Sequence, residues 1–339
     1  MPAPASMRQT AQLGVETTYG VPVAVTKRFT SFGLGKERNM GVASSTPRGQ
    51  TAATQGWVSS EDSAYSIEDG VLSFDEVVWL LNSAINKVAP TTPPGGTVLS
   101  KQRLYRIDQF AADTFASYTI EQGDVARNRG GKAAGGTVQE WGFSVSSTDD
   151  SVGMTGNLVG WKLTDGAMTN LGQGAATDFQ VVIPNHFKLY YGTTWAALTG
   201  TPVEVTNAFT AEFGIGDRRN LVRYLGKADG SPSDVVETVP SLTFDLTRAD
   251  EAAPVDTFLS RARAGQKIFF RLQAKHPTAI EATVFPEFTL DLCTVLRDGP
   301  SDDDEDGVQV VNFPLQPAYD PVSNEIFNIK VINNAATPA

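Results

Sequence analysis

Short apolar runs, separated by glycine, proline and polar residues, recur along the whole chain. Several of them alternate, as Trp141, Phe143 and Val145 do within residues 138–146. A period of two places every second side chain on one face, which predicts strands of a sheet with one buried face. The predicted strands are residues 57–67, 104–107, 115–121, 138–146, 151–158, 209–213, 241–246, 267–272, 287–292, 308–311 and 325–332.

One segment of the first half, residues 73–85, predicts a helix. Ser73 and Glu76 have the spacing of a capping box, which satisfies two free amides of the first turn. Apolar residues follow at helical spacing on one face: Phe74, Val77, Val78, Leu81 and Ile85.

A second helix is predicted from about Asp250 to Ala264. Gly265 is placed as its C-terminal stop, and Pro254 leaves open a start at that residue. The apolar stripe of this helix comprises Val255, Phe258, Leu259 and Ala262.

The same order of elements occurs twice: a strand, a helix, three strands and a charged tip that contains glycine. This repetition of pattern predicts a mainly β protein with two similar domains, each carrying one helix. A polar, glycine-rich segment separates the halves and is expected to be a linker. The predicted divisions are an N-terminal arm at 1–30, a first domain at 31–163, the linker at 164–177 and a second domain at 178–335.

Two charged segments are predicted to be hairpin tips that reach the next ring of an assembly or a neighbouring subunit. Residues 123–136 are rich in glycine and basic, and residues 298–307 are acidic. The acidic run has some likeness to a calcium loop, but its acids are contiguous and no helices flank it, which favours a solvated tip. The basic tip is expected to pair with an acidic surface of a neighbouring subunit rather than with nucleic acid. The charged residues in question are Arg127, Arg129, Lys132, Asp302, Asp303, Asp304, Glu305 and Asp306.

Composition and charge narrow the function. Of 339 residues, 41% are hydrophobic and 19% charged, which is the balance of a globular protein. The net charge of −11 argues against a protein that grips the phosphates of nucleic acid.

The residues that carry chemistry are few. The single cysteine, Cys293, lies in a strand-like run and is expected to be a buried hydrophobic residue. With only His186 and His276 in addition, no usual zinc ligand set or nucleophile–base pair is predicted. The glycines at 33 and 35 lack the rest of a dinucleotide loop. We therefore expect no cofactor, no metal and no enzymatic activity.

No apolar run approaches the length of a membrane-spanning helix, and no secretory signal is recognised at the first residues. We expect no membrane partner.

The order and spacing of several weak motifs resemble the tail tube proteins of long-tailed bacteriophages. The resemblance covers nearly the whole chain. It is carried by residues 14–23, the helix at 73–85, and the segments 118–123, 141–145, 154–160, 236–246 and 268–272.

The resemblance implies β-sandwich domains, each flanked by a helix, whose inner sheets join into a β-barrel within a ring. Stacked rings form the tube through which double-stranded DNA leaves the virion without being bound specifically. If each chain supplies two tube domains, three copies would form a pseudo-hexameric ring. The implied partners are further copies of the chain, the tape measure protein and other tail proteins, and the implied location is the virion tail, assembled in the host cytoplasm.

An acidic lumen would repel DNA phosphates, so that the DNA slides. The strand carboxylates Glu121, Glu212 and Asp291 are the candidates to face this lumen. Three other readings remain open: a baseplate or decoration protein of the virion, a bacterial secretion tube protein, and a carbohydrate-binding β-sandwich adhesin. An adhesin would expose aromatic residues on its loops, whereas the predicted tips carry glycine and charge.

Overall fold

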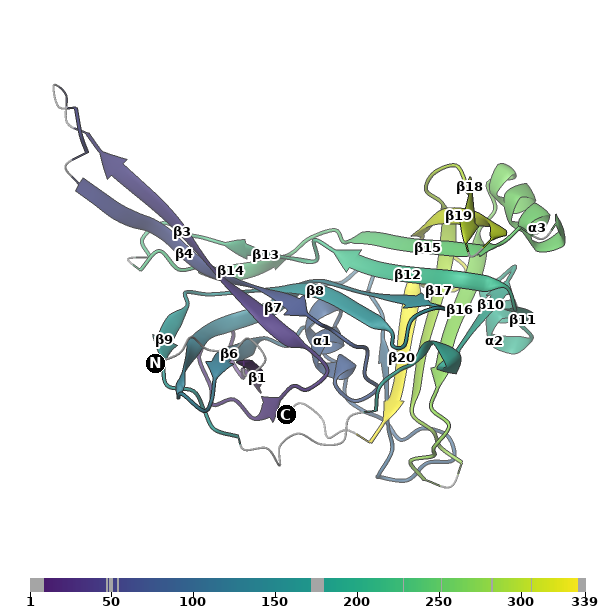
Figure 1. The fold of residues 1–339 in the computed structure, drawn as a ribbon, viewed down its shortest axis with the longest axis horizontal. Coiled ribbons are helices and arrows are strands. Elements are labelled where there is room, and N and C mark those ends of the chain that lie inside the picture. Colours follow the sequence, from purple (N-terminus) through teal and green to yellow (C-terminus); the bar gives the residue numbers. More distant parts are fainter. Residues whose placement is uncertain are drawn as a thin grey trace.

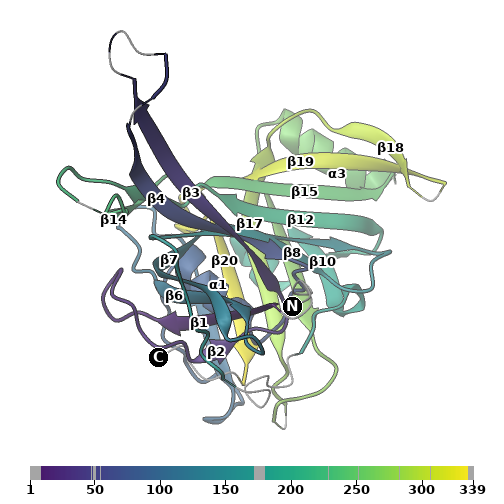
Figure 2. The ribbon, with the colours of Figure 1, turned by 60° about the vertical axis from the view of Figure 1, so that its left-hand side comes forward.

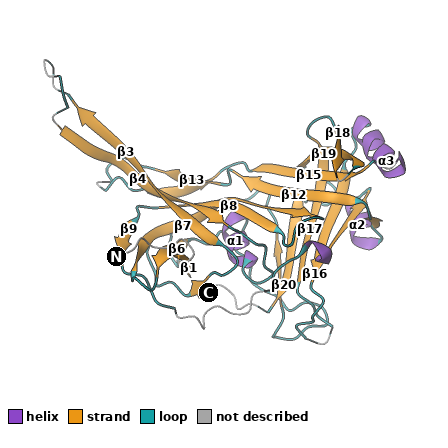
Figure 3. Ribbon diagram, in the orientation of Figure 1, coloured by secondary structure: helices purple, strands orange, loops and turns teal. Residues whose placement is uncertain are grey.

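A computed structural model describes residues 9–46, 48, 51–53, 55–171, 180–227, 229–250, 252–281, 283–305 and 307–334, without the side chains of residues 252–256. The described chain is mainly β and its strands are antiparallel, which confirms the predicted fold class at that level (Figures 1 and 3). The linker prediction, 164–177, lies partly outside these residues, as do residues 1–8 of the predicted arm and residues 178, 179 and 335 of the predicted second domain.

The first half contains β1 (Gln9–Val15), β2 (Lys27–Arg28), β3 (Gly33–Ser45), β4 (Gln55–Glu68), α1 (Val77–Ala84), β5 (Lys101–Tyr105), β6 (Tyr118–Asp124), β7 (Arg129–Ser146), β8 (Gly153–Gly160) and β9 (Thr164–Gly166). The second half contains η3 (Pro184–His186), β10 (Phe187–Gly192), α2 (Trp195–Gly200), β11 (Val203–Val205), β12 (Ala208–Gly216), β13 (Arg219–Val222), β14 (Asp234–Glu237), β15 (Ser241–Ala249), α3 (Ala252–Arg263), β16 (Ile268–Lys275), β17 (Glu287–Leu296), β18 (Ser301–Glu305), β19 (Val308–Pro317) and β20 (Phe327–Asn333).

One antiparallel sheet, here called the long sheet, runs through both halves of the chain (Figures 1 and 2). Its strand order is β3-β4-β8-β7-β12-β15-β19-β18. The halves meet where β7 pairs with β12, from Trp141 opposite Ile215 to Ser146 opposite Thr210. A single hydrophobic cluster includes buried residues from both halves. The division into two tube domains remains a prediction, and strand pairing joins the two predicted units directly.

Each half contributes its four strands to the long sheet in the same spatial order. In the first half β3 and β4 precede the helix α1, β7 and β8 follow it, and the order is first, second, fourth, third. In the second half β12 and β15 precede α3, β18 and β19 follow it, and the order is the same. The repeated order agrees with the duplication that the sequence pattern predicts.

A second sheet packs against the β12–β15 end of the long sheet, with the order β5-β20-β17-β16-β10-β11. Aromatic pairs fill the space between the two layers, with ring centroids 5.4 Å apart for Phe143 and Phe288 and 5.5 Å apart for Phe213 and Phe327. Phe258 of α3 is buried and adds an edge-to-face contact with Phe313 of β19. Two antiparallel layers and the helix α3 therefore enclose a core rich in phenylalanine.

A small sheet, β2-β1-β6-β7-β9, and the buried helix α1 back the other end of the long sheet. The long strand β7 passes from the small sheet into the long sheet. Gly135 adopts a φ of +64° within β7, and a side chain at this position would overlap the ring of Trp161. Only glycine fits such a left-handed position in contact with an indole.

The strand predictions are confirmed in position, since each predicted run overlaps an observed strand. The second helix is confirmed as α3, and Gly265 follows it with a φ of +64°, as a C-terminal stop requires. The first helix begins later than predicted, at Val77, because the capping box does not close. The Ser73 hydroxyl accepts from the N–H of Glu76 at 3.4 Å, but the Glu76 carboxylate bonds Ser31 and Lys27 instead.

The two histidines meet where the chain enters the second half. The rings of His186 and His276 are 5.3 Å apart, and both lie against the buried Phe74 at the start of the α1 segment. Burial, and then the nearby charge of His276, lower the pKa of His186 below its usual 6.5. Asp75, which follows Phe74 in the sequence, is partly buried, and this burial raises its pKa.

The histidine pair predicts that the fold loses stability in mild acid. The unfolded state binds the His186 proton more readily than the folded state, so stability falls as the pH decreases through 6.5 and is unaffected well above it. We expect the Tm to decrease by about 2 °C more between pH 7.5 and 5.5 in the wild type than in His186→Gln. Equal pH dependence of the two proteins in calorimetry would contradict this account.

Candidate functional site

The candidate functional site is the solvent-facing side of the long sheet, here called the polar face. Along each strand, alternate side chains point to opposite sides. In β7, Trp141 and Phe143 are buried while Glu140 and Ser144 are partly exposed, and in β12 Phe213 is buried next to the exposed Glu212. The alternation continues through β15, so one side of the sheet is core and the other is open.

The polar face carries small or acidic side chains. Strand residues on this face include Gly33, Gly35, Glu37, Ser66, Glu68, Asn157, Thr155, Glu140, Ser144, Glu212, Gly214, Thr243, Asp245, Asn312, Ser301, Asp303 and Glu305. None of these described positions is lysine or arginine. Of the cations near them, the Arg297 guanidinium reaches Asp245 at 3.0 Å from the loop that follows β17. At these positions the face therefore carries several acids and no basic residue, and the apolar Val308 and Val310 of β19 also lie on it.

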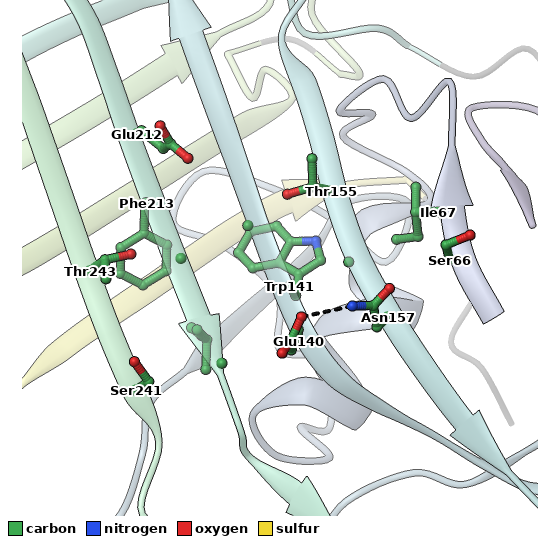
Figure 4. Close-up of a pocket in the computed structure, with 15 residues that line it drawn as sticks. Ser66, Ile67, Glu140, Trp141, Thr155, Asn157, Glu212, Phe213, Ser241 and Thr243 are labelled. Atoms are coloured by element: carbon green, nitrogen blue, oxygen red, sulfur yellow. Dashed lines mark hydrogen bonds between the residues drawn. The ribbon is translucent and has the colours of Figure 1, made fainter. Parts of the chain in front are cut away.

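A shallow depression of about 380 Å³ lies where the two halves meet on this face (Figure 4). It lies over β4, β8, β7, β12 and β15, and the glycines at 142, 156, 214 and 216 help to line it. The side chain of Asn157 donates to Glu140 at 2.7 Å, while Glu212 stands on the neighbouring strand (Figure 4). The depression is lined by two carboxylates, Glu140 and Glu212, and by no histidine, cysteine, lysine or arginine.

The long sheet ends in two strands that have no strand neighbour on one side among the described residues. β3 pairs only with β4, and β18 pairs only with β19. An open edge presents backbone N–H and C=O groups to any strand that can pair with it. The two ends of the sheet are therefore candidate contact sites.

A ribbon, here called the projecting ribbon, extends beyond the sheet and consists of residues 40–45 of β3 and 55–60 of β4 (Figures 1 and 2). Its apolar side chains are open to solvent: Val42 is 70% exposed and Trp57 is 50% exposed. The β13–β14 hairpin lies beside its base, where Arg223 forms an ion pair with Asp62. A two-stranded ribbon with bare apolar side chains is only marginally stable in water, so this ribbon is a candidate contact surface.

Of the three carboxylates predicted to face a lumen, only Glu212 lies on the polar face. Glu121 is 2% exposed and forms an ion pair with Lys132 at 3.1 Å. Asp291 is 5% exposed, and its carboxylate accepts two hydrogen bonds from the Arg271 guanidinium, the shorter being from Nε at 2.6 Å. Each of these two acids is buried and paired with a partly exposed cation, so neither carboxylate is open to solvent in the single chain.

The predicted hairpin tips are mostly strand. In the basic segment β6 and β7 continue to Asp124 and Arg129, so only a short turn remains, in which Arg127 pairs with Asp124 at 3.5 Å. Lys132 lies within β7. In the acidic segment Asp302, Asp303, Asp304 and Glu305 form β18, a correction to the predicted loop, and Asp306 lies outside the described residues.

The sequence reasoning missed β3 and the ribbon. The alternation of Leu34 with Gly33 and Gly35 is a strand signal, but beyond residue 35 every side chain of β3 is exposed or half-buried and no hydrophobic pattern marks it. The turn-rich segment at 46–54, between β3 and β4, was the remaining clue to a hairpin.

No three side chains of His, Cys, Asp or Glu gather into a possible metal site in the described part of the chain. Within the same residues, no helix has the length and apolar character needed to cross a membrane. No family model matches the chain, and no curated protein matches it.

Proposed function

We propose that this chain is a non-catalytic building block of a bacteriophage tail tube, in which copies form rings that stack around a channel for DNA. The observation that carries the proposal is the long sheet. It joins both halves of the chain, packs its apolar side against a core, leaves its small, acidic side bare and has an open edge at each end. A sheet of this kind can close with further copies into a barrel that is lined by its polar face.

Barrel geometry favours three copies in a ring. One chain supplies eight strands to the long sheet. A barrel of only eight strands would leave no channel, because side chains fill its interior. Three chains supply 24, and with strands about 4.8 Å apart and tilted by about 40° the backbone circle is roughly 50 Å across. Such a barrel leaves room for a DNA duplex after the side chains are added.

The chemistry of the polar face suits a conduit. Proteins that hold DNA do so with lysine and arginine placed against its phosphates. Glu140 and Glu212 would instead repel phosphates, and the glycines between them keep the wall free of side chains that could catch a base. DNA would therefore pass without specific binding. Other tail proteins would bind at the ends of the tube and, before ejection, inside it.

A carbohydrate-binding adhesin is the second candidate, and one observation favours it. The aromatic side chains of Trp57 and Tyr224 are exposed on the two neighbouring hairpins. Exposed aromatic residues of this kind stack on sugar rings as readily as they pack against protein. Specific binding on a glycan array, with no assembly of the protein, would support the adhesin over the tube.

Electron microscopy of the purified chain in negative stain tests the proposal. We expect rings with a stain-filled centre, and long tubes as the protein concentration is raised. A protein that stays monomeric in sedimentation at every concentration and ionic strength tried would contradict the proposed function.

A further inference from the structure

The contact between the two halves of the chain shows how one four-strand unit joins the next. β7 is the third strand of the first unit in sequence and lies at its spatial end. It pairs antiparallel with β12, which is the first strand of the second unit. The joint covers six residue pairs, from Thr210 opposite Ser146 to Ile215 opposite Trp141, and the apolar side chains of both strands continue into one core.

Each of the two strands in this joint, β7 and β12, has a counterpart in the other unit, and both counterparts are edge strands of the long sheet. β18 occupies in the second unit the place that β7 has in the first, and β3 occupies in the first unit the place of β12. We propose that β18 of one copy pairs antiparallel with β3 of the next copy, repeating between chains the joint that β7 and β12 make within the chain. This inference rests on the proposed function, because it names the strands through which the ring would close.

The charges on the apolar side of the two edge strands agree with this pairing, whereas on the polar face both strands carry acids. Asp302 is opposite Val311, which lies on the apolar side of the long sheet, so Asp302 and Asp304 project to that side. On β3, Lys36 is opposite the buried Tyr65 and projects to the same side. Lys36 is exposed, as are both acids. Pairing β18 with β3 would place acids beside a base on one face, which stabilises neighbouring strands.

The same charges oppose the alternative of two-fold contacts. If β18 paired with β18 of a second copy, two strands of sequence Asp-Asp-Asp-Glu would lie side by side, and like charges directly opposite one another are destabilising. A head-to-tail contact between different strands closes into a ring, whereas a two-fold contact stops at a dimer. The acidic edge therefore directs the chain towards rings.

Charge reversal tests the assignment. The variants are Asp302→Lys with Asp304→Lys, Lys36→Asp alone, and all three together. The control is Asp149→Lys with Asp150→Lys, which changes the net charge equally on the exposed turn after β7. We expect the β18 variant to yield less than about one tenth of the wild-type sedimentable tube, Lys36→Asp to be impaired, and the triple variant to recover about half. The control should assemble normally.

Circular dichroism identifies any variant that does not fold. If the β18 variant does not fold, Asp302→Asn with Asp304→Asn takes its place, and we expect this milder variant to assemble less well than the control. If the β18 variants formed tubes as well as the wild type and the control do, the β18–β3 pairing would be overturned. The proposed function would still stand. A wild-type chain that forms no assembly would fail the proposed function itself, and this inference with it.

Discussion

Replacing Phe143 by alanine is expected to lower the free energy of unfolding by about 3–5 kcal/mol, the range for large aromatic side chains removed from a core. Phe143 is 1% exposed and stands at the joint between the halves. Its ring lies 5.4 Å from that of Phe288 in the opposite layer and 6.1 Å from that of Phe213 on the neighbouring strand. Alanine would leave a cavity that neither layer can close.

The joint also predicts how the loss is distributed. Because β7 and β12 share one core, the variant should still unfold in a single transition that tryptophan fluorescence and circular dichroism report together. Guanidinium denaturation measures the free energy of unfolding and the number of transitions. The matched control is Val98→Ala, at a residue that is 76% exposed. A loss of unfolding free energy below about 1 kcal/mol would contradict the tight packing at the joint. Unfolding of the first half alone would show that the halves are independent.

Replacing Val42 and Trp57 by serine is expected to stop tube growth while leaving separate rings. Both side chains are exposed on the projecting ribbon, so the fold of the single chain should be unaffected. Stacked rings need a contact along the tube, and this prediction assigns that contact to the ribbon, where burying the two side chains would contribute about 2 kcal/mol per chain. Every chain of a ring would make this contact, so the substitutions would remove the same free energy of ring stacking once for each chain in the ring.

Sedimentation followed by electron microscopy measures this effect. The matched control is Val98→Ser with Val322→Ser, two exposed valines in loops away from the ribbon. Tubes of normal length from the ribbon variant would show that the ribbon does not join the rings.

Local patterns predicted eleven of the observed strands because apolar and polar residues alternate in many of them, as in residues 138–146 and 287–292. They did not predict β18, since four contiguous acids have low strand propensity. That strand exists through its pairing with Val310 and Val311 of β19, a case of tertiary context overriding local preference. The capping box failed for a similar reason, because Ser31, distant in sequence, competes for the Glu76 carboxylate.

The candidate site could be predicted only in part. Alternation in β12 places Glu212 on the side of the sheet opposite the buried Phe213, so this acid is exposed to solvent in the single chain, and its place in a lumen stays a prediction. Glu121 and Asp291 sit in equally strand-like runs, but Lys132 and Arg271 on neighbouring strands pair with them. The joint of β7 with β12 connects residues about 70 apart, and no local pattern specifies such a pairing.

Electron cryo-microscopy of the assembled tube tests the central claim most directly, because it shows which side of the long sheet lines the channel. The account predicts three chains in each ring and a continuous barrel of 24 strands, with Glu140, Glu212 and Asp245 on its inner wall. A ring of six full-length chains would contradict the stoichiometry. A channel lined by any other surface, with the polar face turned outwards, would contradict the account as a whole.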